Sequence, residues 1–190
     1  LLHSCCAPCS THVIDLLKNY FDITVFYSND NIDLAEEFNK RLTEEKNYCK
    51  QFNIPVIEDK YDTSLFEKAI KGYEHCGEKS KRCYECYFFR LEKTVLKAKE
   101  LKFDFFTTTL SISPHKVSQW INEIGNFLEQ KYGVLFLYSD FKKEEGYKHS
   151  ITLSKEYGLY RQDYCGCKYS KEERNQRLYG KNKENYRKTS

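Results

Sequence analysis

The sequence has no apolar run of about 18 residues, the length that a membrane-spanning helix needs. Its mean hydropathy is −0.74, and 31% of its residues are charged. These features exclude a membrane span and predict a soluble protein without a membrane partner. Leu1 and Leu2 are too few to form the apolar core of a signal peptide, so we expect no targeting segment. The sequence also lacks internal repeats, low-complexity segments and domain linkers.

The length of 190 residues suits one domain with a substantial hydrophobic core and requires no second domain. Positive charge is concentrated at the C-terminus, because residues 168–190 contain eight Lys or Arg and three Glu, a net charge of +5 that leaves −2 for the rest. We therefore predict a single domain over residues 1–170 and a basic tail over residues 171–190. The tail either binds phosphates through its cations or is a solvated, partly disordered end.

Hydrophobic periodicity predicts alternating strands and helices. Apolar, β-branched and aromatic runs indicate strands before Pro8 and at residues 23–27, 54–57, 103–110 and 134–138. Amphipathic patterns indicate helices at residues 8–20, 34–52, 64–70, 82–100, 117–131 and 147–157. This alternation predicts an α/β fold, with a mostly parallel sheet and helices on both faces.

Sheets of this kind bind ligands beyond the carboxyl ends of their strands. This rule brings residues 5–9, 28–31 and 111–116 to one edge, where we expect the functional site. His3 lies within the first strand and is expected to be a hydrogen-bonded core histidine rather than a ligand. The histidines other than His3 and His115 show no spacing that suggests a partner.

Cysteine is the residue type that distinguishes this sequence. Seven of the nine cysteines occur in CCxxC, CxxC and CxC groups, namely Cys5, Cys6 and Cys9, Cys83 and Cys86, and Cys165 and Cys167. Such close spacing is typical of metal or redox sites, so we favour these over secretory disulfides and expect a cytoplasmic protein. The remaining two, Cys49 and Cys76, are expected to have no functional role.

Two kinds of metal site fit the CCxxC and CxxC groups. Two CxxC pairs meet the spacing of a structural zinc site, whereas an iron–sulfur cluster beside a second metal or a redox pair would use all seven thiols. Cys5 and Cys6 have side chains that would diverge in a strand, so only a turn would direct both sulfurs to one centre. Cys83 and Cys86 lie on one face of the first turn of a helix, where the helix dipole favours thiolates.

A loop near the C-terminus combines redox and recognition chemistry. A single glycine separates Cys165 from Cys167, so the two thiols can close into a small strained ring, and strained disulfides are easily reduced. We therefore favour a redox pair here over cluster ligands. Asp163 either holds a proton or a metal beside this pair or is simply solvated. Tyr160, Arg161 and Tyr164 suit stacking on an unpaired base, although packing explains the tyrosines equally well.

Polar residues after the fourth predicted strand are candidate substrate ligands. His115 and Lys116 can contact an anion. The hydroxyls of Thr109 and Ser113 can donate hydrogen bonds to a substrate, and ordinary strand packing is the alternative explanation for the threonine.

Four segments together resemble the epoxyqueuosine reductase QueH family: HSCCAPCS at residues 3–10, CYEC at 83–86, TTTLSISPHK at 107–116 and YRQDYCGC at 160–167. The resemblance extends over about residues 1–170. It implies a cobalamin-independent iron–sulfur enzyme that reductively removes the epoxide oxygen of epoxyqueuosine at the tRNA wobble position, which gives queuosine. The family is similar in fold to Rossmann-like nucleotide-binding proteins. CCAPC stands where an ATP-pyrophosphatase relative has a glycine-rich phosphate loop, so the resemblance implies no use of ATP.

The resemblance also implies roles for individual residues. The ligands of a [4Fe-4S] cluster match Cys5, Cys6, Cys83 and Cys86. The redox-active pair matches Cys165 and Cys167, and we place Asp163 with this pair in the catalytic set. Cys9 matches a position where some relatives have an aspartate that binds a second metal, which implies a mononuclear iron or zinc beside the cluster. The residues assigned to the substrate or the tRNA are Thr109, Ser113, His115, Lys116, Tyr160, Arg161 and Gln162.

The partners implied by the resemblance are a tRNA with epoxyqueuosine in its anticodon and an unidentified electron donor. Two other classes of protein remain open. One is a zinc protein that binds RNA without catalysis. The other is a thiol oxidoreductase that acts on proteins through the CxC pair alone.

Overall fold

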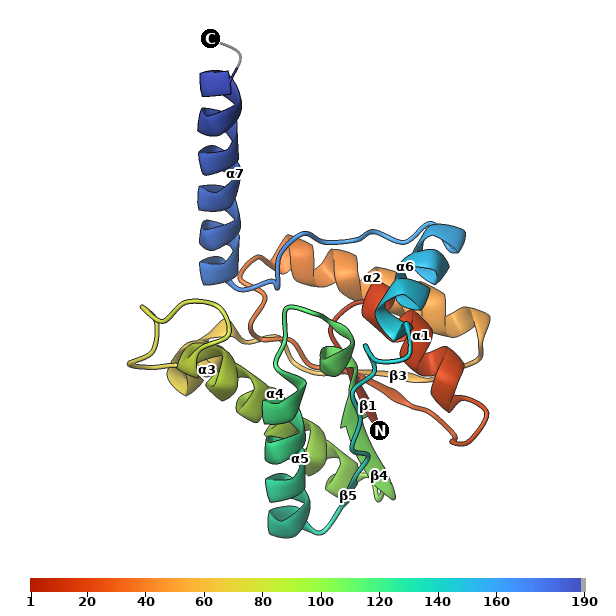
Figure 1. Cartoon of the computed structure of the whole chain (residues 1–190). Coiled ribbons are helices and arrows are strands. Elements are labelled where there is room, and N and C mark those ends of the chain that lie inside the picture. The colour runs from red at the N-terminus through yellow and green to blue at the C-terminus, as the bar shows by residue number, and fades with distance from the viewer. Residues whose placement is uncertain (189–190) are drawn as a thin grey trace.

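The computed structural model describes the backbone of residues 1–188 and the side chains of residues 1–179. Its elements follow in the order β1 (Leu2–Ser4), α1 (Ala7–Leu17), β2 (Val25–Tyr27), α2 (Ala35–Gln51), β3 (Val56–Glu58), α3 (Thr63–Ala69), α4 (Lys81–Glu100), β4 (Phe105–Thr108), the 3₁₀ turn η1 (Thr109–Ile112), α5 (Ser118–Tyr132), β5 (Leu135–Phe136), α6 (Gly146–Glu156) and α7 (Lys168–Lys188) (Figure 1). No helix in this described part is long and apolar enough to cross a membrane.

Parallel pairing of five short strands forms the centre of the fold, in the order β3-β2-β1-β4-β5. β1 is the middle strand, because Leu2 lies opposite Val25 of β2 on one side and Thr107 of β4 on the other. β3 pairs with β2, and β5 pairs with β4. The predicted α/β fold with a parallel sheet is confirmed. Its strand order reverses between β1 and β4, which is where doubly wound α/β proteins bind ligands.

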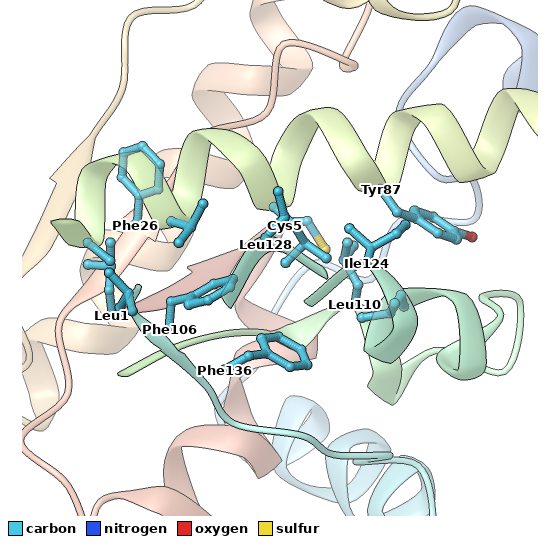
Figure 2. Close-up of a cluster of buried hydrophobic side chains, with 14 of the residues drawn as sticks. Leu1, Cys5, Phe26, Tyr87, Phe106, Leu110, Ile124, Leu128 and Phe136 are labelled. Carbon is cyan, nitrogen blue, oxygen red and sulfur yellow. The ribbon is translucent and has the colours of Figure 1, made fainter. Parts of the chain in front are cut away.

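Helices cover both faces of the sheet (Figure 1). α1 packs with α2 and α6 on one face, and α4 packs with α5 on the other. Figure 2 shows the apolar layer between α4 and the sheet, in which Cys5 lies together with Tyr87 and Leu110. The first cysteine group therefore adjoins the hydrophobic core rather than the outer surface.

The strands are shorter than the sequence pattern predicts, and β4 and β5 show the largest differences. The strand expected at residues 103–110 ends at Thr108, whose hydroxyl accepts a hydrogen bond of 3.1 Å from the backbone N–H of Leu110 and so caps η1. β5 contains only Leu135 and Phe136 of the expected residues 134–138. Local bonding by a threonine hydroxyl thus outweighs the β-propensity of the threonine run.

The basic tail continues a helix that begins at Lys168, and this helix extends away from the sheet (Figure 1). Ion pairs connect its first turns to the domain, namely Lys168–Glu67, Glu173–Arg82, Arg174–Asp163 and Arg177–Glu78. Residues 189–190, and the side chains from Gly180 onward, lie outside the described part. The boundary at residue 170 and phosphate binding by the tail stay predictions.

A glycine at the start of α6 permits its close contact with α1. A Cβ on Gly146 would overlap the carbonyl oxygen of Phe141 and lie 2.7 Å from His12 Nε2. Since a backbone atom cannot rotate away, we expect Gly146→Ala to lower the free energy of unfolding by about 1–3 kcal/mol. Urea denaturation measures this change. Gly77→Ala is the control, because nothing lies within 4 Å of a Cβ there, and equal stability of the two variants would contradict the close contact.

Candidate active site

A cleft of about 380 Å³ opens at the carboxyl edge of the sheet. It is lined by members of all three cysteine groups, namely Cys5, Cys9, Cys83, Cys86, Cys165 and Cys167. Of the segments predicted to meet at this edge, residues 5–9 and 111–116 contribute to its walls, whereas residues 28–31 are buried and do not line it. The fold thus brings together cysteines that are far apart in the sequence.

The first cysteine group lies at the junction of β1 and α1. β1 ends at Ser4 and Cys6 directly precedes α1, so the turn that two neighbouring cysteines need is present. The sulfurs of Cys5 and Cys6 are 3.8 Å apart, and those of Cys6 and Cys9 are 3.0 Å apart. Among the described residues, these three form the one group of His, Cys, Asp or Glu side chains close enough to share a metal ion, with all sulfurs within 4.8 Å.

Protonation differs within this group. Hydrogen bonds from Cys6 and Cys9 hold the pKa of Cys5 well below its ordinary value. Burial raises the pKa of Cys6, and hydrogen bonds to its two neighbours raise the pKa of Cys9. Negative charge in the group is therefore concentrated on Cys5, next to the apolar core.

The second group lies in the first turns of α4, as predicted. Cys83 and Cys86 line the cleft, but their sulfurs lie outside the close group formed by the first three cysteines. Burial raises the pKa of Cys83 and brings the pKa of Cys86 to about 12. The expected preference for thiolates at this helix start is not found, because desolvation of the thiolate outweighs the effect of the helix end.

The third group lies in the loop before α7, and this loop is tightly held. Gly166 has a φ of 121°, which favours glycine, and a Cβ there would lie 2.9 Å from Ile32. The backbone N–H of Asp33 donates to the Gly166 carbonyl at 3.1 Å, and Arg41 Nη1 donates to the Cys165 carbonyl at 3.2 Å. Both cysteines of the CxC pair are free thiols, and a disulfide between them stays a prediction.

The two cysteines of the CxC pair have different affinities for a proton. Lys116 Nζ donates to Cys165 Sγ at 3.1 Å. Burial acts to raise the pKa of Cys165, but the charges of Lys116 and Arg90 outweigh it and hold that pKa below its ordinary value. Burial raises the pKa of Cys167 to about 11. The loop therefore favours a thiolate at Cys165 and a thiol at Cys167.

Most of the other predicted site residues also line the cleft, namely Ser113, His115, Lys116, Arg161, Gln162 and Asp163. Gln162 Nε2 donates to Cys6 Sγ at 2.7 Å, so the C-terminal loop contacts the first cysteine group directly. Asp163 Oδ2 forms an ion pair with Nη1 of Arg174 in α7, at a distance of 3.0 Å. A role for this carboxylate in proton or metal binding stays a prediction.

Three predicted site residues do not line the cleft, namely Cys6, Thr109 and Tyr160. Cys6 is fully buried. Thr109 is fully buried in η1. The ring of Tyr160 has Lys40 Nζ 3.4 Å from its centroid, and its backbone N–H donates to Glu44 at 2.5 Å. These contacts hold Tyr160 against α2, which does not favour stacking on a base.

Sequence reasoning missed the buried arginines around the site. Arg41 and Arg90 are each 1% exposed, and the charge of Arg90 acts on Cys165 as described above. A signal was present in the sequence, because Arg90 follows Cys86 by one helical turn and must share its face of α4. Charged residues on the inward face of an amphipathic helix are candidates for a functional site.

The histidines lie in different environments, some in the core and some at contacts between helices. His3 is fully buried, with Nδ1 2.8 Å from Thr108 Oγ1, and burial lowers its pKa to about 3. The prediction of a hydrogen-bonded core histidine is confirmed. Sequence spacing gave no sign of the contact between His12 of α1 and His149 of α6, whose Nδ1 atoms are 3.0 Å apart.

The chain is similar to known proteins over nearly its whole length. A sequence model of the family described as "Epoxyqueuosine reductase QueH" matches residues 1–173. Curated proteins of that name include one from Streptococcus pyogenes serotype M1, which is 40% identical over 176 residues, 90% of this chain and 69% of the relative. Another, from Thermotoga maritima, is 39% identical over 183 residues, 93% of this chain and 92% of the relative. A third, from Staphylococcus aureus, is 38% identical over 178 residues, 90% of this chain and 74% of the relative.

Lys116 is the cation in direct contact with Cys165 and contributes most to lowering its pKa. Lys116→Met removes the cation that lowers the pKa of Cys165, so we expect alkylation of Cys165 at pH 7 to slow by about tenfold or more, the size of effect that an adjacent opposite charge has on ionisation. The rate should recover as the pH rises, because the thiolate then forms without help. Mass spectrometry of iodoacetamide-treated protein measures it. Lys116→Arg keeps the charge and should keep the rate, and an unchanged pH profile in Lys116→Met would contradict the pairing.

Proposed function

Because this chain belongs to the epoxyqueuosine reductase QueH family, we propose that it converts epoxyqueuosine in the tRNA anticodon to queuosine by removing the epoxide oxygen. The observation that carries the proposal is the meeting of three cysteine groups in one cleft. Neither a structural zinc site nor a CxC oxidoreductase needs all three groups beside a cavity of this size.

We propose that the cysteines hold a metal centre. The donor set fits, because thiolates are the preferred ligands of iron–sulfur clusters and of zinc. Two thiolates on one tetrahedral metal with bonds of ~2.3 Å lie ~3.8 Å apart, and the sulfurs of Cys5 and Cys6 are 3.8 Å apart. As they stand, these two thiols suit one shared metal ion, and as cluster ligands on two different irons they would have to move apart. The ligands we assign to a [4Fe-4S] cluster are Cys5, Cys6, Cys83 and Cys86, with Cys9 beside them at a second iron or zinc.

The proposed reaction consumes two electrons and two protons, because an epoxide becomes an alkene and its oxygen leaves as water. Bound iron would supply single electrons and a Lewis acid for the epoxide oxygen. Oxidation of the Cys165–Cys167 dithiol to a disulfide forms one S–S bond and releases two electrons and two protons, which balances the reaction. An external electron donor must then reduce the pair again.

The chain's own residues suit the proton transfers of this proposal. The Cys167 thiol, with a pKa of about 11, retains its proton near neutral pH. The Lys116 ammonium, 3.1 Å from Cys165, keeps a second proton at the same pair. The apolar side chains of Phe66, Tyr87 and Ile112 contribute to the walls of the cleft and limit access of water to it.

Serine variants separate the two proposed roles of the cysteines. We expect Cys165→Ser and Cys167→Ser to abolish conversion of epoxyqueuosine tRNA while most of the iron–sulfur absorption is retained. Cys83→Ser and Cys86→Ser should remove the absorption itself. Anaerobic metal analysis, absorption spectra and a turnover assay on the same samples measure these effects.

The control for the serine series is Cys76→Ser, a half-buried cysteine that does not line the cleft, which should retain both absorption and turnover. Loss of the absorption band in Cys165→Ser would instead make this residue a cluster ligand. Full turnover by protein that contains only zinc would contradict the redox proposal.

The proposed tRNA contacts predict a strong dependence on salt. We expect an anticodon stem-loop to bind this chain and its affinity to fall steeply as salt rises, because cations that contact phosphates release counterions. Removing residues 181–190, which contain four Lys or Arg, should weaken binding and reduce the salt slope. Fluorescence anisotropy measures both quantities. An affinity that does not change on truncation would show that the tail is a solvated end without contacts to the RNA.

A further inference from the structure

One buried cation at the base of the cysteine site has no carboxylate partner. Arg90 of α4 is 1% exposed and forms no ion pair with a carboxylate among the described residues. Arg41 and Arg82, which are buried to a similar extent, pair with Glu37 and Glu173. Arg90 therefore differs from the other buried arginines of the described chain.

The hydrogen bonds of Arg90 are to neutral groups. Nε donates to His3 Nε2 at 3.3 Å, and Nη2 donates to Asn29 Oδ1 at 2.6 Å. Nη1 has no hydrogen-bond partner within the part of the chain that the structure describes. His3 cannot act as a counter-charge, because its ring is neutral with a pKa of about 3.

A buried guanidinium without an anion is costly, since the desolvation penalty for an unpaired charge is several kcal/mol. The geometry places this charge beside the cysteines. Arg90 lies one turn beyond Cys86 on the same helix, α4. Its hydrogen bond to His3 of β1 places it next to the strand that leads into Cys5, so Arg90 adjoins the first two cysteine groups with Nη1 unpartnered among the described residues.

We propose that Arg90 is the fixed counter-charge of the thiolate-bound metal centre and raises its reduction potential, an inference that rests on the proposed function. Each electron added to the centre adds one negative charge. A permanent cation in the low-dielectric interior stabilises the reduced state more than the oxidised state, and buried charge is one of the determinants of cluster potentials. Arg90 is a positioning residue in this role, because the cleft reaches the cysteines and not Arg90.

The bonds to His3 and Asn29 explain why an arginine suits this position. They fix the guanidinium plane through Nε and Nη2 and leave Nη1 free to donate toward the sulfurs. A lysine would retain the charge without this fixed orientation. The two properties, charge and orientation, can therefore be separated by substitution.

The test compares Arg90→Gln with Arg90→Lys in anaerobically reconstituted protein. Spectroelectrochemical titration measures the midpoint potential, and metal analysis of the same samples measures occupancy. We expect Arg90→Gln to shift the one-electron equilibrium at least tenfold toward the oxidised state, which lowers the midpoint potential by about 59 mV. Arg90→Lys keeps the charge, so its potential should stay close to that of the unsubstituted protein. The Lys131→Gln/Glu92→Gln double variant removes an ion pair between α5 and the same helix α4 that does not line the cleft, and it should leave the potential unchanged.

Each outcome decides the inference. A potential that is equal in Arg90→Gln and the unsubstituted protein overturns it, and so does a protein whose centre has no redox couple. If Arg90→Gln loses the metal, retention in Arg90→Lys supports a requirement for charge, whereas loss in both variants shows a purely structural role and overturns it. Conversion of epoxyqueuosine tRNA is assayed separately. If the protein converts the tRNA but its midpoint potential does not change in Arg90→Gln, only this inference is contradicted. If the potential changes in Arg90→Gln but the unsubstituted protein does not convert the tRNA, only the proposed function is contradicted.

Discussion

Parallel pairing of β1 between β2 and β4 is the constraint on which the site depends. The carboxyl ends of neighbouring parallel strands meet at one edge of a sheet, so the cysteines that follow β1 and the turn that follows β4 become neighbours. The reversal of strand order there sends α1 to one face and α4 to the other. The cleft lies at this divergence, and α4 directs its first turns, with Cys83 and Cys86, into the same space.

Thiols and cations are buried together at this edge, and each reduces the cost of burying the other. Charges interact strongly where water is excluded, so the pKa of Cys165 is lowered beside Lys116, while burial and the charges of neighbouring cysteines raise the pKa of Cys86. Lys116 approaches the sulfurs from the cleft, whereas Arg90 approaches them from the core. The electrostatics of the site are therefore set by residues on two separate elements, the segment before α5 and the helix α4.

The C-terminal loop completes the site from the opposite end of the sequence. Gln162 contacts the sulfur of Cys6, and the backbone of Asp33 holds the carbonyl of Gly166. The ion pairs at the start of α7 add contacts to α3, α4 and the loop between them. The exposed pairs Lys168–Glu67 and Arg177–Glu78 contribute little individually. The Cys165–Cys167 loop is held more directly by its bonds to Arg41 of α2 and to Asp33 in the turn after β2.

Local patterns were enough to predict the alternation of strands and helices, the seven clustered cysteines and the sheet edge at which the first cysteine group lies, because periodicity and motif spacing are properties of neighbouring residues. They also located Cys83 and Cys86 in the first turns of a helix and His3 in the core. Tertiary structure alone decided the partner of Lys116, the unpaired burial of Arg90 and the high pKa of Cys86. These depend on which distant groups exclude water from a side chain and bring charge to it, and no spacing within the sequence encodes that.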